Sequence, residues 1–167
     1  MTILRYLING FLLILPALIW NIIFTRFLPG GFSSENYDRN VPRRLMFLEN
    51  ILRVPVFFLP VYMPIGLDTT VQKAGLALYL AGIFLYCASW LFEIFFPLSG
   101  WSRSKAGFLA PAYTPIVWLT GIGMMTGSSF GIEPTRISAF YISLSLLFLS
   151  IHLKHASIAF DNINRLD

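Results

Sequence analysis

The sequence predicts an all-α membrane protein, a bundle of five transmembrane helices, from its composition and from the spacing of its apolar runs. Hydrophobic residues make up 56% of the chain and charged residues 12%, whereas a soluble domain is about 45–50% apolar and about 25% charged. The mean hydropathy is +0.70. Five apolar runs each approach the roughly 20 residues that a bilayer core of about 30 Å requires. A segment in lipid must satisfy its own backbone polar groups, so each run is expected to be a helix within one integral membrane domain, 1–167.

The first two spans are expected at about residues 4–28 and 45–66. The first run is longer than the apolar region of about 7–15 residues in a signal peptide, so it is interpreted as a membrane helix. Pro16 predicts a bend in it. Residues 29–44 are rich in Pro, Gly, Ser and Asn, a composition typical of a loop.

The other three spans are expected at about residues 74–97, 107–127 and 136–155. Pro111 and Pro115 predict an irregular start to the fourth span. Irregular backbone at membrane depth is tolerated where it lines a cavity or is buried in protein.

The basic residues predict the orientation of the bundle. With five spans, one side carries eight cationic residues and the other side three. The eight are Arg26, Arg39, Arg43, Arg44, Arg103, Lys105, Lys154 and Arg165, and the three are Arg5, Lys73 and Arg136. The positive-inside rule then places the N-terminus outside and the C-terminus in the cytoplasm. We expect an integral protein of the bacterial inner (plasma) membrane.

Several classes of function are not supported by the residues. The net charge of +4 comes from short loops between apolar runs, which indicates topology and contact with anionic lipid and not nucleic acid. Cys87 is the only cysteine, which excludes a disulfide framework or a thiolate cluster. His152 and His155 are interpreted as interfacial side chains. No phosphate-loop, di-iron, zinc-protease or dinucleotide motif is present, so no cofactor and no metal are expected.

Polar side chains from all five spans fall in the half of the membrane next to the basic side. Such residues are expensive in lipid and are usually functional. They are Asn21, Glu49, Asn50, Arg53, Glu93, Tyr113, Thr114, His152 and His155.

The orientation of Arg53 decides how these groups combine. Glu49 lies four residues before Arg53 on one helix face, so the two can pair with each other near the interface. Alternatively Arg53 faces the bundle interior and pairs with Glu93, which has no basic residue one turn away on its own helix. The sequence leaves both alternatives open, and we favour the interior.

The leading functional hypothesis is that a cavity in the cytoplasmic half binds a lipid or another amphipathic small molecule. Its predicted ligand-binding residues are Arg53, Glu49, Asn50, Glu93, Trp101, Tyr113, Thr114, Asn21 and Arg26, and Arg43 and Arg44 are expected to contact lipid headgroups. One alternative is a membrane-embedded enzyme acting on a lipid-like substrate, with Glu93 as the candidate acid or base. Another is an accessory or assembly subunit that contacts other membrane proteins through Gly123, Gly127, Ser143 and Ser150. The sequence does not decide whether the protein is an enzyme.

Overall fold

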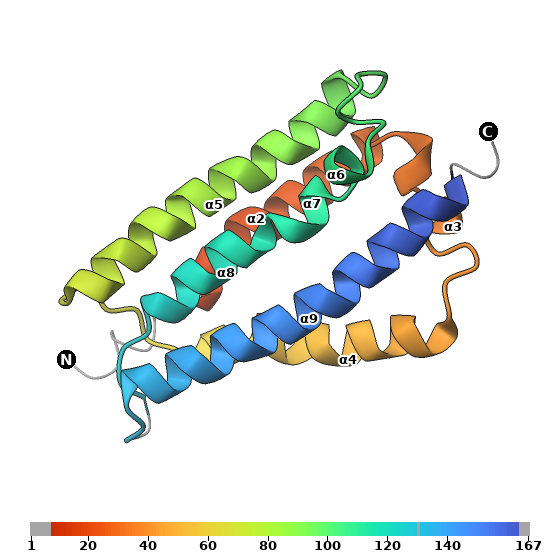
Figure 1. Cartoon of the computed structure of the whole chain (residues 1–167). Coiled ribbons are helices and arrows are strands. Elements are labelled where there is room, and N and C mark those ends of the chain that lie inside the picture. Colours follow the sequence, from red (N-terminus) through yellow and green to blue (C-terminus); the bar gives the residue numbers. More distant parts are fainter. Residues whose placement is uncertain (1–7, 130, 164–167) are drawn as a thin grey trace.

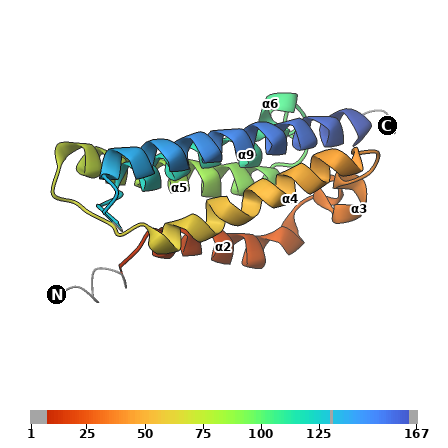
Figure 2. The same ribbon diagram turned by 90° about the horizontal axis from the view of Figure 1, so that it is seen from below.

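The structure, a computed structural model, describes residues 8–129 and 131–163, and most of these residues are helical. Pairing of the β type is confined there to isolated bridges. The longer helices run side by side along a common direction (Figure 1, Figure 2). They are α2 (Phe11–Phe24), α4 (Arg43–Phe58), α5 (Thr70–Phe95), α8 (Pro115–Met124) and α9 (Pro134–Ile163). The predicted all-α class is therefore confirmed.

Shorter helical pieces connect these helices. They are η1 (Thr25–Phe27), η2 (Gly30–Phe32), α3 (Ser34–Tyr37), η3 (Leu59–Tyr62), α6 (Lys105–Phe108) and α7 (Ala110–Tyr113). Residues 4–7 of the first predicted span, with Arg5, lie outside the described residues, as does Arg165.

Among the described residues, three helical segments are long and apolar enough to cross a membrane: Arg43–Tyr62, Thr70–Phe95 and Pro134–Ile163. Only 17%, 33% and 22% of their most apolar windows are buried inside the molecule. Most residues of these windows are therefore at least partly exposed, and lipid solvates such apolar surface better than water does. The chain has the helices of a membrane protein.

The segments predicted as the first and fourth spans are built differently from these three. Phe11–Phe27 is a shorter apolar helix. The fourth segment is divided into α6, α7 and α8, which confirms its predicted irregular start. Pro111 and Pro115 each stand at the beginning of a helix, α7 and α8. Proline lacks a backbone N–H and fits the first turn of a helix, so each one ends the preceding piece and starts the next.

Two helix ends differ from the predicted bounds. The second segment stops being helical at Tyr62, before the predicted residue 66, and its backbone then pairs with neighbouring segments: the Gly66 amide donates to the Met125 carbonyl at 2.8 Å. Helix α9 continues to Ile163, beyond the predicted residue 155. Ala156 and Ala159 are buried in this extension, and tertiary packing stabilises a helix that the polar sequence alone does not predict.

Glycines allow α8 to pack closely against the helices on both of its sides. A Cβ on Gly82 of α5 would lie 2.9 Å from the Trp118 Cα, and a Cβ on Gly121 would lie 2.6 Å from the Tyr79 nitrogen. A Cβ on Gly123 would lie 2.6 Å from Ile142 of α9. The predicted small-residue packing thus includes contacts between helices of this same chain.

One end of the bundle carries most of the basic loops and helix ends, and α3, α6 and the C-terminal end of α9 lie there (Figure 1). We call this the basic end because its described residues include Arg26, Arg39, Arg43, Arg44, Arg103, Lys105 and Lys154. Lys105 of α6 pairs there with Asp161 of α9 at 2.9 Å. The Asn162 amide donates to the Arg39 carbonyl at 2.8 Å. These contacts attach the connections to the end of α9.

Candidate functional site

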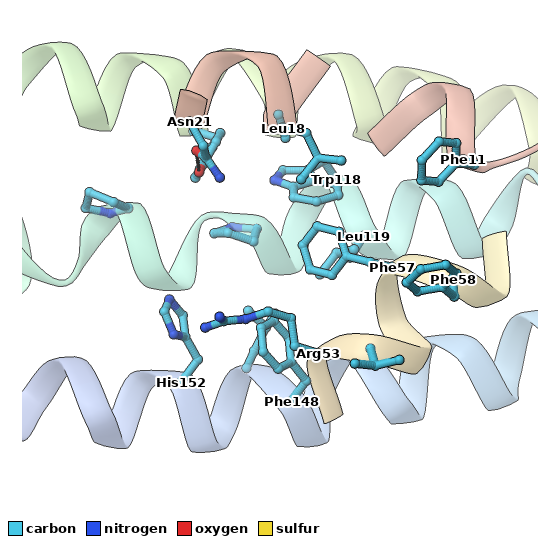
Figure 3. Close-up of a pocket in the computed structure, with 16 residues that line it drawn as sticks. Phe11, Leu18, Asn21, Arg53, Phe57, Phe58, Trp118, Leu119, Phe148 and His152 are labelled. Atoms are coloured by element: carbon cyan, nitrogen blue, oxygen red, sulfur yellow. Dashed lines mark hydrogen bonds between the residues drawn. The ribbon is translucent and has the colours of Figure 1, made fainter. Parts of the chain in front are cut away.

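A cavity of about 630 Å³ lies among the five longer helices (Figure 3). This volume is in the range of about 300–1,000 Å³ that small-molecule sites occupy. Most of its lining is aliphatic or aromatic. The lining residues are Phe11, Ala17, Leu18, Asn21, Arg53, Val54, Phe57, Phe58, Tyr86, Pro111, Pro115, Trp118, Leu119, Phe148, Leu149 and His152. We call it the central cavity.

The central cavity is polar at one end and apolar at the other. Asn21 and His152 lie toward the basic end, with Arg53 beside them, whereas Phe11 and Phe58 lie toward the opposite end (Figure 3). The ten steps along α2 from Phe11 to Asn21 correspond to roughly 15 Å at about 1.5 Å per residue. A ligand of matching shape would have a polar head and an apolar tail of about that length.

The polar end is organised by Glu49, which is only 3% exposed although it carries a carboxylate. Arg53, one turn further along α4, donates from Nη2 to Glu49 Oε1. His152 Nδ1 lies 3.0 Å from the same oxygen, and His155 Nδ1 lies 2.6 Å from Oε2. Three polar groups thus satisfy one buried carboxylate, as burial of a charge requires, and they join α4 to α9.

The network continues into the loop at the basic end through His155. Its Nε2 lies 3.1 Å from Asp38 Oδ1, which is an ion-pair distance without the geometry of a hydrogen bond. The Tyr37 ring packs on His155 with centroids 4.9 Å apart. Burial raises the pKa of Tyr37, and the Glu49 and Asp38 carboxylates raise it further, so this phenol stays neutral.

The structure separates the residues that the sequence predicts as one site. Asn21 and Arg53 line the central cavity, Glu49 lies behind them, and Asn50 Oδ1 accepts from Arg53 Nη1 at 3.3 Å. The favoured pairing of Arg53 with Glu93 is wrong: Arg53 lines the interior but its carboxylate partner is Glu49. Glu93 lines a different cavity, because its face of α5 is turned toward Ser102 and away from α4.

Four other predicted ligand-binding residues do not line the central cavity. Trp101 is 47% exposed on a connecting loop, and Arg26 is exposed beside the loop that contains α3. Thr114 is buried, and its hydroxyl donates to the Ala110 carbonyl one turn earlier, which is a local backbone contact. Tyr113 is half-buried on α7.

Sequence reasoning missed the role of the two histidines and of the aromatic walls. His152 and His155 contact Glu49 directly instead of lying free at the interface. The available signal was their spacing of three residues at the depth of Glu49 on another helix. Tyr86, whose hydroxyl donates to Asn21 Oδ1, and Trp118 had no comparable signal, because aromatic residues occur throughout the apolar runs.

Two of the residues predicted to face another subunit are exposed, and one is buried within the chain. Ser143 and Ser150 lie on the outer face of α9, where Ser150 Oγ donates to the Leu146 carbonyl of its own helix. Gly123 is buried against Ile142, and Gly127 is half-buried near the Pro64 carbonyl.

Among the described residues, no group of three His, Cys, Asp or Glu side chains is arranged to hold a metal ion. The chain was also compared with models of protein families, with curated proteins and with solved structures, and none of them matches it.

Proposed function

We propose that the protein binds an amphipathic small molecule, with its tail in the central cavity and a carboxylate or phosphate head beside Arg53. The observation that carries this proposal is a cavity of about 630 Å³ with apolar walls and a polar group of Asn21, Arg53 and His152 at one end. Apolar walls with a few convergent polar groups are typical of small-molecule sites.

Arg53 suits an acidic head because it has donors to spare. A guanidinium has five N–H donors in a fork that matches carboxylate and phosphate oxygens. Glu49 and Asn50 take two of them. Its side chain remains 48% exposed, so the other donors are accessible from the cavity. His152 presents Nε2 as a further polar contact, since its Nδ1 faces Glu49.

Entry from the bilayer is the route that suits such a ligand. Val54 and Phe58 line the central cavity and are 58% and 64% exposed, so the cavity reaches the molecular surface along α4. We place the basic end at the cytoplasmic face of the bacterial inner membrane by the positive-inside rule. Arg43 and Arg44 would contact anionic headgroups there.

Changing Arg53 to Gln is expected to reduce retention of the native amphiphile by about tenfold or more, because an acidic head loses a charge-assisted pair of about 1.5–3 kcal/mol. Native mass spectrometry of the protein released from detergent measures the retained ligand directly. Lys73→Gln is the control, since Lys73 is an exposed cation at the opposite end of α5 and does not line the cavity.

Equal retention by both variants would refute the ligand site. A stoichiometric protein partner in place of a small molecule would instead favour the accessory subunit, with the exposed Ser143 and Ser150 face of α9 as its contact.

A membrane-embedded enzyme is a second candidate, favoured by the pairing of Glu49 with His152 beside the cavity. A carboxylate that holds one ring nitrogen leaves the other able to accept a proton from water or from a substrate hydroxyl. His152, and not Glu93, would then be the base, because Glu93 does not line the central cavity. A chemically altered lipid in the native spectrum, absent from His152→Gln, would support this candidate.

The five-span arrangement is part of the proposal and predicts that the connection at residue 39 and the turn at residue 68 lie on opposite sides of the membrane. In a chain with Cys87→Ala, Arg39→Cys and Asp68→Cys would each introduce one exposed thiol. Asp68 is preferred to Thr69, whose side chain caps α5.

A membrane-impermeant maleimide added to intact spheroplasts is expected to label position 68 and to reach position 39 only after lysis. Labelling of both thiols from the same side would refute the five-span arrangement.

A further inference from the structure

Glu93 is a buried carboxyl group whose surroundings in this chain do not complete its hydrogen bonding. The residue is 2% exposed, and its Oε1 is buried without a hydrogen-bond partner among the described residues. Ser89, four residues earlier on α5, and Pro97, four residues later and past the end of the helix, are not basic. An unsatisfied buried carboxyl group costs free energy that a ligand able to donate hydrogen bonds would recover.

Two cations that lie toward the basic end among the described residues are engaged with other carboxylates. Arg53 pairs with Glu49, and Lys105 pairs with Asp161. Arg103 is exposed and lines the same cavity as Glu93. The site thus offers one buried carboxyl group and, nearer the surface, one guanidinium.

The cavity beside Glu93, which we call the Glu93 cavity, has a volume of about 560 Å³ and opens at the basic end. Its walls come from Pro29 and η2, from α5 and the loop that follows it, from α6, and from the end of α9. Three aromatic rings line it: Phe32 stacks on Phe108 at 4.4 Å between centroids, and Phe108 lies 5.4 Å from Phe160. Lys105 Nζ lies 5.9 Å from the centroid of the Phe160 ring, so an ammonium group is already held against one of these rings. Aromatic rings that line a cavity together with a carboxyl group can bind organic ammonium groups.

We propose that the Glu93 cavity binds the headgroup of a zwitterionic phospholipid with a primary amine, that is, phosphoethanolamine on a lipid. The ammonium donates to Glu93 against the aromatic rings, and the phosphate pairs with Arg103 nearer the surface. A primary ammonium has three N–H donors for the unsatisfied oxygen, whereas the quaternary ammonium of a choline lipid has none. The basic end of the bundle is where phospholipid headgroups are expected to lie.

The test uses the full-length protein in nanodiscs that contain equal amounts of phosphatidylethanolamine, phosphatidylcholine and phosphatidylglycerol. Native mass spectrometry after release is expected to show about tenfold preference for the ethanolamine lipid over the choline lipid, a ratio set by the unsatisfied hydrogen bond. Glu93→Gln is expected to abolish this preference. Glu35→Gln is the matched control, because Glu35 is a carboxylate at the same end with an 86% exposed side chain.

Arg103→Gln keeps the proposal testable if Glu93→Gln does not fold, because Arg103 is exposed. It is expected to weaken retention of all three phospholipids while the preference for the primary amine remains. Arg53→Gln is expected to leave that preference unchanged. A negative result for the Glu93 cavity can therefore be distinguished from a negative result for ligand binding in the central cavity.

Equal retention of choline and ethanolamine lipids, or an unchanged preference in Glu93→Gln, would overturn the proposal. Displacement of the lipid by an equal concentration of soluble phosphoethanolamine would overturn its assignment to a membrane lipid.

Discussion

Replacing Glu49 by Gln is expected to lower the free energy of unfolding by about 3 kcal/mol, the lower end of the cost of breaking a buried ion pair. Glu49 is 3% exposed and accepts contacts from Arg53, His152 and His155. The side-chain oxygen of Gln at this position accepts only part of these contacts, and the NH₂ group of the same side chain then faces a donor. The loss is placed at the lower end because the Arg53 side chain is 48% exposed and remains solvated.

Unfolding in mixed micelles of increasing denaturing detergent, followed by tryptophan fluorescence, measures this difference. Glu35→Gln removes an exposed carboxylate of the same kind and is expected to change stability by less than about 0.5 kcal/mol. The double variant Glu49→Gln with His155→Gln should lose less than the sum of its single changes, because both residues belong to one network. Strict additivity, or a Glu49 variant as stable as the control, would contradict this role of the network.

Gly82→Ala is expected to destabilise the bundle by about 2 kcal/mol, the upper end of the cost of overpacking less the gain in helix propensity. A Cβ at this position would overlap the backbone nitrogen of Trp118 and would lie 2.9 Å from its Cα, so the atoms that must move belong to the backbone of α8. Overpacking of this kind costs typically 1–3 kcal/mol. The gain in helix propensity from glycine to alanine, about 1 kcal/mol, opposes it and does not cancel it.

The same detergent titration measures the effect, with Gly100→Ala as the control. No atom lies within 4 Å of a Cβ added to Gly100. Separation of α5 from α8 should also change the central cavity, which Tyr86 and Trp118 line from these two helices. The Gly82 variant is therefore expected to retain less ligand than Gly100→Ala. Wild-type stability of Gly82→Ala would mean that the two helices tolerate a wider separation.

The helices themselves were predictable because they depend on local sequence. Long apolar runs have few ways to satisfy their backbone other than helix formation, and prolines fix where helices stop and start, as Pro111 and Pro115 do. The contact of Glu49 with Arg53 was also predictable, because residues four apart on a helix share a face. The five spans and the orientation of the bundle remain predictions.

The candidate site depends on which face each helix turns toward its neighbours. The residues of α5 are apolar on nearly all faces of the helix. The sequence therefore offered no indication that Glu93 faces Ser102 and not Arg53. The depth of His152 and His155 along α9 matches that of Glu49, but it does not reveal that their side chains turn toward its carboxylate. The sequence by itself determined a helical membrane protein with polar groups near one end. Only the tertiary structure divided those groups between two cavities, because the rotation of each helix is decided by close packing at residues such as Gly82 and Gly121.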